Sequence, residues 1–202
     1  STRAEDVARL TAGTNADLLR TDPPYGVDYQ TKLSREEAVA RHRRRDGLEV
    51  SNDSATDIPR LLHSMLRHAP LRVGGSYYLA SPSSAEVLPA FYAALAEADM
   101  PVRQQLIWVK DAFVMGRHDY HYRHEPVLYG WRAGAAHAFH GGRAQDTVWE
   151  IPRPRRSESH PTMKPVELVV RALENSSVAG AVVYEPLTGP GAALLASEQT
   201  GR

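Results

Sequence analysis

Asp22 begins a loop whose residue types could hold a planar amine and polarise it. Two prolines and Tyr25 follow it, and a short apolar run at residues 16–21 precedes it. The prolines fix the backbone and remove two N–H donors, so that stiff carbonyl acceptors stand beside a carboxylate and a flat ring. This set suits the NH2 group of a base extruded from a nucleic-acid helix. The plainer alternative is an Asp-Pro turn with a packed tyrosine. The candidate catalytic residues are Asp22, Pro23, Pro24 and Tyr25.

A second loop, residues 185–191, could hold an anionic group. Gly189 and Gly191 flank Pro190, and a predicted helix follows at residues 192–199. Backbone N–H groups and the dipole at the start of a helix favour a carboxylate or a phosphate. A Gly-x-Gly alone more often marks a tight turn, and no third glycine stands at the spacing of the dinucleotide-binding pattern.

Both loops follow predicted strands. Apolar patterns and breakers predict strands at residues 16–21, 76–80, 102–109, 127–131, 147–151 and 181–184, and helices at 58–69, 86–98, from 165 towards Gly180, and at 192–199. Gly74-Gly75 is expected to break the pattern before the second strand. Strands that alternate with helices predict an α/β fold with a doubly wound, mainly parallel sheet. Ligands of such sheets bind at the carboxyl ends of the strands, where both loops lie.

The composition is that of one folded α/β domain. The chain has 202 residues, no cysteine and a net charge of zero. Without cysteine it can form no disulfide, thiolate zinc site or cysteine nucleophile. Its nine histidines show no metal-ligand spacing, so we expect no metal. No apolar run is long enough for a bilayer span, and no signal peptide opens the chain. We therefore expect a cytoplasmic protein.

Because the net charge is zero, a nucleic-acid partner would need a local basic patch. Arginines gather at residues 41–45 and again at residues 153–156. Taken alone, such clusters are more often solvated surface runs than nucleic-acid contacts.

Three motifs in a fixed order give the chain a family resemblance. Asp22–Tyr25 comes first, His160–Pro165 precedes a predicted helix and strand, and Glu185–Gly191 comes last. This order resembles the circularly permuted β group of DNA amino-methyltransferases, in which the catalytic loop precedes the cofactor glycine loop. The stretches at residues 106–110 and 124–131 are also similar to family sequence.

The resemblance implies a Rossmann-like methyltransferase core that spans residues 1–202. It implies S-adenosylmethionine as cofactor, DNA as partner, and transfer of a methyl group to an exocyclic base amine, adenine N6 above all, on a flipped-out base. The residues expected to bind the cofactor are Asp22, Thr162, Lys164, Glu185, Leu187, Thr188, Gly189 and Gly191.

Two insertions, residues 28–57 and 111–145, are the candidates for DNA recognition. The second mixes basic, aromatic and histidine residues with glycines, a composition suited to phosphate and base-edge contacts. A polar surface loop is the alternative. Lys110 and Lys164 could each contact a phosphate, contact a cofactor carboxylate or cap a charge. The expected DNA-binding residues are Arg43, Arg44, Arg45, Lys110, Arg117, His118, Tyr120 and His121.

The chain departs from the family pattern at several points. Glu185 stands where the family usually has Asp, Leu187 where it has Phe, and Pro190 separates the glycines. The strand that follows the cofactor helix in the family, with its acidic residue, is missing. We interpret the chain as a fragment of a longer protein that lacks the last strands of its sheet.

Two other functions stay open. Cytosine N4 methylation is the same reaction, but that subgroup more often has Ser in place of Asp22. A catalytically silent DNA- or cofactor-binding module is the alternative from another class, favoured by the altered glycine loop. Dimers are frequent in the group, so a homodimer is a further expectation, and a DNA-modifying enzyme would act at the nucleoid.

Overall fold

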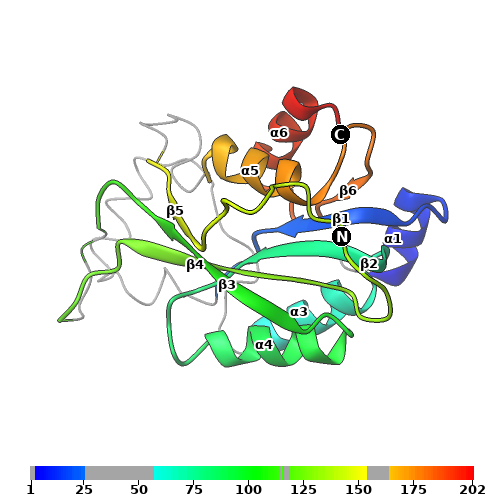
Figure 1. Cartoon of the computed structure of the whole chain (residues 1–202). Helices are drawn as coiled ribbons and strands as arrows, with labels where there is room; N and C mark the ends of the chain where they lie inside the picture. Colours follow the sequence, from blue (N-terminus) through cyan, green and yellow to red (C-terminus); the bar gives the residue numbers. More distant parts are fainter. Residues whose placement is uncertain (1–2, 26–56, 114, 116–118, 154–163) are drawn as a thin grey trace, which may run out of the picture.

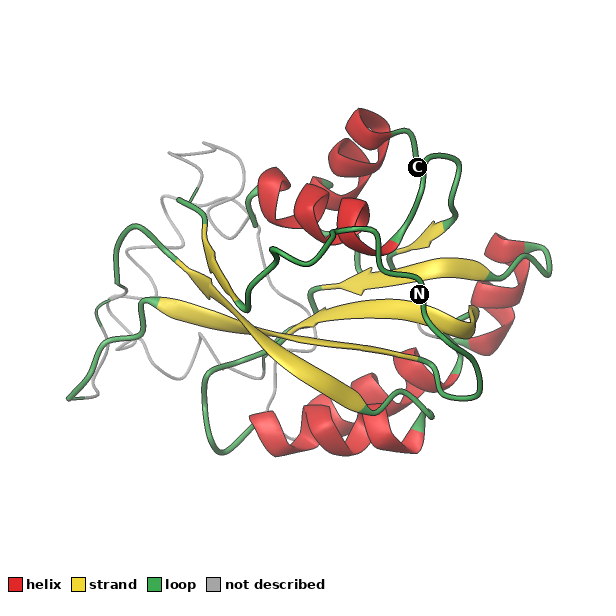
Figure 2. Ribbon diagram, in the orientation of Figure 1, coloured by secondary structure: helices red, strands yellow, loops and turns green. Residues whose placement is uncertain are grey.

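Six strands form one sheet in the order β5-β3-β4-β2-β1-β6, with helices packed against it (Figures 1 and 2). This computed structural model describes residues 3–25, 57–113, 115, 119–153 and 164–202. The strands are β1 (Ala16–Thr21), β2 (Leu71–Ala80), β3 (Val102–Val109), β4 (His124–Trp131), β5 (Val148–Glu150) and β6 (Val183–Tyr184). The helices are α1 (Ala4–Thr11), α3 (Ile58–Arg67), α4 (Leu88–Glu97), α5 (Val166–Ser176) and α6 (Ala192–Thr200). Within the described residues, none of them is long and apolar enough to cross a bilayer.

The sheet is mostly parallel, as the alternation of strands and helices predicts. β1 pairs in parallel with β2 and with β6, and β3 pairs in parallel with β5. The exception is β4, which runs antiparallel to both of its neighbours, β2 and β3. β3 and β4 are consecutive strands that lie side by side as a hairpin, the arrangement that antiparallel pairing permits. All the other strands therefore point their carboxyl ends towards one edge.

Neighbouring residues of β1 show that the sheet is covered on both faces. Leu19 packs into a core with residues of α3 and α4, whereas Leu18 packs into a second core with residues of α5 and α6. Both leucines are fully buried, which contributes about 1.5–3 kcal/mol each. Successive side chains of a strand point to opposite faces, so a strand buried on both sides has a continuous apolar run. The predicted doubly wound architecture is confirmed.

The pairing of β1 with β6 brings the two predicted loops together. Leu18 lies opposite Val183, and Leu19 lies opposite Tyr184. Because the pairing is parallel, both strands end at the same edge of the sheet, one just before Asp22 and the other just before Glu185. The catalytic and glycine loops predicted from the sequence are thus neighbours in space.

The predicted break at Gly74-Gly75 is wrong, because β2 continues through both glycines. The register of β1 against β2 shifts at this point, from Ala16 opposite Leu71 to Leu18 opposite Ser76. Gly74 has a φ of +74°, which glycine adopts without strain. The glycines therefore form an irregularity within a strand and do not end it.

Gly130 offers a test of this packing. It lies on β4 opposite Tyr77, and an added Cβ would lie 2.6 Å from the Pro101 carbonyl oxygen and 2.7 Å from the Tyr77 hydroxyl. We expect Gly130→Ala to lower the free energy of unfolding by about 1–3 kcal/mol, measured by urea denaturation. The control Val73→Ala, at an exposed position of β2, should change it by less than about 0.5 kcal/mol. Equal unfolding midpoints for the parental chain and Gly130→Ala would contradict the packing described.

Candidate active site

Asp22 and Tyr25 come from the proline loop that directly follows β1. The Tyr25 hydroxyl lies 3.1 Å from Asp22 Oδ1 and 3.2 Å from Glu125 Oε2, so its single proton is shared between two carboxylates. The ring edge packs against Phe91 of α4, with 6.4 Å between the ring centroids. Burial, followed by the two nearby carboxylates, raises the pKa of Tyr25 well above its ordinary value, which keeps the hydroxyl a donor.

Lys164, just before α5, lies between the two carboxylates. Its Nζ is 2.7 Å from Glu125 Oε2 and 3.3 Å from Asp22 Oδ1. The same ammonium lies 5.0 Å from the centroid of the Tyr25 ring, within the range of a cation–π contact. The side chain is 11% exposed. Burial opposes the charge, but the two carboxylates outweigh it and raise the pKa of Lys164.

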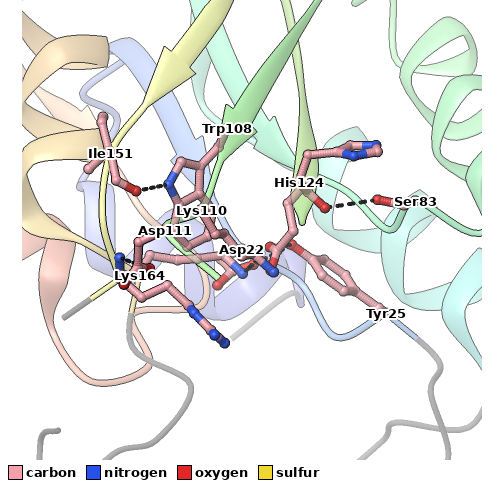
Figure 3. A network of polar contacts seen from close by, with 11 residues as sticks. Asp22, Tyr25, Ser83, Trp108, Lys110, Asp111, His124, Ile151 and Lys164 are labelled. Carbon is pink, nitrogen blue, oxygen red and sulfur yellow. Dashed lines mark hydrogen bonds and ion pairs between the residues drawn. The ribbon is translucent and has the colours of Figure 1, made fainter. Parts of the chain in front are cut away.

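Glu125 is the centre of this group of charges. It stands near the start of β4, opposite the end of β3, where Lys110 follows. Lys110 Nζ forms an ion pair with Glu125 Oε1, while Oε2 faces Lys164 and Tyr25. Burial raises the pKa of Glu125, but the ammonium groups of Lys164 and Lys110 outweigh it and lower the pKa to about 2. Figure 3 labels Asp22, Tyr25, Lys110 and Lys164 in this network of polar contacts.

Trp108 packs beside both lysines. Its indole Nε1 donates a hydrogen bond of 2.7 Å to the carbonyl oxygen of Ile151, which follows β5 (Figure 3). The ammonium of Lys110 lies 5.3 Å from the indole ring, and that of Lys164 lies 5.8 Å from it. The ring therefore screens both charges from the core on the α5 and α6 side of the sheet.

The glycine loop is fastened to β1 by a buried ion pair. Arg20 Nη1 lies 3.0 Å from Glu185 Oε2, and both side chains are 9% exposed. The other carboxylate oxygen, Oε1, accepts a hydrogen bond of 3.2 Å from the backbone N–H of Leu187. Burial raises the pKa of Glu185, and the Arg20 guanidinium opposes that shift. Glu185 thus fixes the start of the loop.

The start of α6 follows two glycines in the left-handed region of backbone conformation. Gly189 and Gly191 have φ values of +50° and +87°, which only glycine adopts readily. Among the residues that the structure describes, no side chain caps the helix, so its first N–H groups have no side-chain acceptor there. An added Cβ at Gly191 would meet nothing within 4 Å.

A cavity of about 670 Å³ runs along the outer side of β6. Two of the predicted cofactor residues, Glu185 and Thr188, line it, together with residues of α6 and Leu10 of α1. Its lining also includes Ala16 and Pro70, at the amino ends of β1 and β2, so the cavity extends away from the glycine loop along the edge strand. Neither Asp22 nor Lys164 lines it, so the cavity adjoins the glycine loop and does not enclose the charged group.

The structure brings most of the predicted site residues to one edge. Asp22, Tyr25 and Lys164 are in direct contact, and the loop of residues 185–191 is attached through Arg20. Lys110 was predicted to contact DNA, but its ammonium is buried and paired with Glu125, so its position gives that role no support. Tyr120 and His121 lie apart, in the loop between β3 and β4. The predicted residues outside the described part of the chain are Arg43, Arg44, Arg45, Arg117, His118 and Thr162, with residues 28–56 of the first insertion.

Sequence reasoning missed Glu125, Arg20 and Trp108 as site residues. Glu125 lies within a stretch that was matched only as a whole, and a single acidic residue near a strand terminus carries no spacing pattern. Arg20 interrupts the apolar run of β1, and a charge inside a buried strand needs a partner. That interruption is the one feature of the sequence that could have pointed to a paired arginine.

Several solved structures of DNA methyltransferases share this fold. The complex of M1.HpyAVI with SAM matches with a TM-score of 0.65 and 19% identity, over 98% of this chain and 86% of that chain. A putative DNA modification methylase from Thermus thermophilus gives 0.60 and 18%, over 98% and 83%. PvuII DNA methyltransferase, named as cytosine-N4-specific, gives 0.68 and 10%, over 93% and 73%. No protein-family model and no curated protein matches the sequence. The chain therefore has the fold of these methyltransferases.

The two carboxylates of the site, Asp22 and Glu125, are better placed to bind and polarise a polar group than to take up or release a proton. Both carboxylates are paired with ammonium groups, and the low pKa of Glu125 excludes it as a proton acceptor near neutral pH. Within the described residues, no group of three or more His, Cys, Asp or Glu side chains could hold a metal ion. The arrangement offers fixed acceptors and fixed charges beside an uncapped helix start.

Glu125→Gln tests the electrostatics of the site. Folding lowers the pKa of Glu125 from 4.5 to about 2, so its charge stabilises the fold fully above about pH 4.5 and this contribution is lost as the pH falls towards 2. Near pH 7 the parental chain should exceed the variant in free energy of unfolding by about 3 kcal/mol. Urea unfolding over a pH series measures this gap, which should narrow in acid. If the difference in free energy of unfolding between the two chains does not change with pH, Glu125 is not ionised in the folded chain as described.

Proposed function

We propose that the chain is an S-adenosylmethionine-dependent DNA methyltransferase that methylates an exocyclic base amine, adenine N6 above all, on a flipped-out base. The observation that carries the proposal is the position of Asp22. Its carboxylate stands in a proline-stiffened loop at the end of β1, next to the glycine loop that follows β6. The resemblance to the circularly permuted β group and the fold of the solved methyltransferases support the same interpretation.

The glycine loop fits the cofactor. The N–H groups at the uncapped start of α6 suit a carboxylate, and the open space at Gly191 admits a ligand close to the backbone. The adjoining cavity of about 670 Å³ is large enough for a molecule of this size. Glu185 would act here mainly through its hold on the loop, since both carboxylate oxygens have partners. The residues that would contact the cofactor are Asp22, Leu187, Thr188, Gly189 and Gly191, with Glu185 behind them. Lys164, also predicted to bind the cofactor, is left out because its ammonium is paired with Glu125 and Asp22.

Asp22 would bind and orient the target amine. Its carboxylate and the carbonyl oxygen of Pro23 accept hydrogen bonds from the NH2 group, which turns the nitrogen lone pair out of conjugation with the ring. When bound, the cofactor supplies an electrophilic methyl group on a sulfonium. Methyl transfer would leave the electron pair of the S–C bond on sulfur, and the amine nitrogen held by Asp22 and Pro23 would be briefly positive until it loses a proton to water. The carboxylate stabilises that positive charge as it develops.

Tyr25 would support the flipped base. Lys164 lies over one face of its ring, and the hydroxyl is directed at Asp22 and Glu125. A base would therefore stack on the face opposite Lys164, where aromatic stacking is worth about 1–3 kcal/mol per base. Phe91 and the buried hydroxyl fix the ring in advance, which lowers the entropic cost of binding.

DNA would be contacted by the loop between β3 and β4, which belongs to the second predicted insertion. This loop leaves the sheet at Lys110 and returns at His124, so both of its ends adjoin the charged group. Tyr120 is 90% exposed, Met115 is 76% exposed, and the ring of Phe113 stacks on that of His121 at 5.2 Å. We retain Tyr120 and His121 as DNA contacts and leave Lys110 out. A homodimer and a cytoplasmic site at the nucleoid remain expectations of the proposal.

A silent module that binds DNA or cofactor without turnover is the second candidate. The observation that favours it is the occupation of Asp22 Oδ1 by both Tyr25 and Lys164, at the atom where an amine could bind. Calorimetry with S-adenosylmethionine separates loss of binding from loss of turnover.

Asp22→Ala is expected to abolish methyl transfer. Removal of one charged acceptor typically lowers kcat by about 10²–10³-fold, and the fold should survive because Lys164 keeps its contact with Glu125. Label transfer from S-adenosylmethionine to DNA measures kcat. The matched control is Asp17→Asn, an aspartate on the same strand that is paired with Arg72 away from the site. Parental activity in Asp22→Ala would refute the role of Asp22.

The target base can be identified separately. Asp22 stands where the cytosine N4 subgroup more often has Ser, so we expect N6-methyladenine in nucleosides prepared from treated DNA. Because PvuII DNA methyltransferase, with the same fold, is named as cytosine-N4-specific, the fold does not select the base. N4-methylcytosine as the sole product would replace the adenine assignment and leave the reaction class intact.

A further inference from the structure

Glu125 is shared by three donors, although the proposed chemistry does not use it. Lys110 binds Oε1, while Lys164 and the Tyr25 hydroxyl bind Oε2. The side chain is 19% exposed, so these contacts take the place of water. Since Lys110 occupies one oxygen, the other is aimed at Lys164.

Lys164 creates a problem for the proposed reaction. Its ammonium lies 3.3 Å from Asp22 Oδ1, and opposite charges at such a distance attract strongly where water is scarce. A full ion pair would neutralise the carboxylate that has to stabilise the positive amine. An acceptor already compensated by a cation stabilises a second cation far less.

The distances show how this conflict is resolved. Lys164 is nearer to Glu125, at 2.7 Å, than to Asp22, at 3.3 Å, and the shorter contact is also a hydrogen bond. Two carboxylates and two ammonium groups lie together, so the group has no net charge. The second ammonium, that of Lys110, pairs with Glu125 and holds that side chain in place. Among the described residues, the contacts of Tyr25 and Lys164 with Asp22 both go to Oδ1, which leaves Oδ2 for the amine.

We propose that Glu125 is a positioning residue for amine methylation, which holds the ammonium of Lys164 in a shorter contact of its own so that the charge of the catalytic carboxylate is less fully compensated. The inference rests on the proposed function. Glu125 itself touches neither base nor cofactor and acts through Lys164. Lys164 in turn orients Asp22 through the longer of its two contacts, at 3.3 Å.

Two variants test the proposal: Glu125→Gln, and the double variant that adds Lys164→Met. The question is whether the second substitution raises or lowers kcat relative to Glu125→Gln. Glu125→Gln keeps the shape but removes the charge, so Lys164 should pair fully with Asp22 and kcat at saturating cofactor should fall by about tenfold or more. Adding Lys164→Met removes the competing ammonium, and kcat of the double variant should rise several-fold above that of Glu125→Gln. Both variants lack the Glu125 charge beside Lys110, so they differ only at position 164.

Three controls make the result specific. Glu125→Asp, which keeps the charge, should retain more kcat than Glu125→Gln. Glu97→Gln, at an exposed glutamate paired with His63, should leave kcat unchanged. Thermal midpoints of all variants separate loss of fold from loss of rate. A double variant equal to or slower than Glu125→Gln, or parental kcat in Glu125→Gln, would overturn the proposal.

A crystal structure of Glu125→Gln gives a readout that needs no activity. The Nζ of Lys164 should move from 3.3 Å to about 2.8 Å from Asp22, the usual length of a charge-assisted contact. If the Lys164 ammonium of the variant stays in place or turns to solvent, Glu125 does not determine its position. If the parental chain transfers no methyl group to DNA, the proposed function fails, and this structure still decides the role of Glu125.

Discussion

The structure depends on one constraint: charges buried at the carboxyl edge of the sheet must be compensated within a few ångströms. Asp22, Glu125, Lys110 and Lys164 meet there from separate parts of the chain, and the Tyr25 hydroxyl donates to the two carboxylates. An unpaired ion at such a site would cost several kcal/mol. Ion pairs, in addition to packing, therefore connect the end of β1, the β3–β4 hairpin and the segment before α5. The same constraint holds the glycine loop, because Arg20 of β1 can be buried only with Glu185 beside it.

The sequence allowed the layers of the fold to be predicted, because they follow from local patterns. Apolar patterns bounded by breakers predicted β1 and β3, helical periodicity predicted α3 and α5, and the alternation of strands and helices predicted the doubly wound sheet. The proline and glycine loops were found because each has a stiff or permissive backbone that is recognisable locally. The strand start at Gly74-Gly75 was misjudged, since the same residues can end a strand or kink it.

The charged group could not be predicted in the same way. Asp22 and Lys164 belong to motifs that the sequence shows, but Glu125 by itself resembles an ordinary surface residue, and nothing local predicts that these residues meet. Glu125 acquires its two ion pairs only in the folded chain. The antiparallel pairing of β3 with β4 places it beside Lys110, and the segment before α5 places Lys164 next to it. The comparison with solved methyltransferases also separates fold from site, because the fold is shared at only 10–19% sequence identity. Packing preserves the fold at that distance, whereas the function has to be argued from the site.

The proposal that this edge of the sheet transfers a methyl group to DNA has one most direct test. The chain is incubated with DNA of mixed sequence and S-adenosylmethionine that carries a labelled methyl group, and the modified positions are then mapped. We predict label in the DNA, confined to base amines and to positions that share a short sequence. DNA that stays unlabelled, while calorimetry shows the cofactor bound, would contradict the proposal.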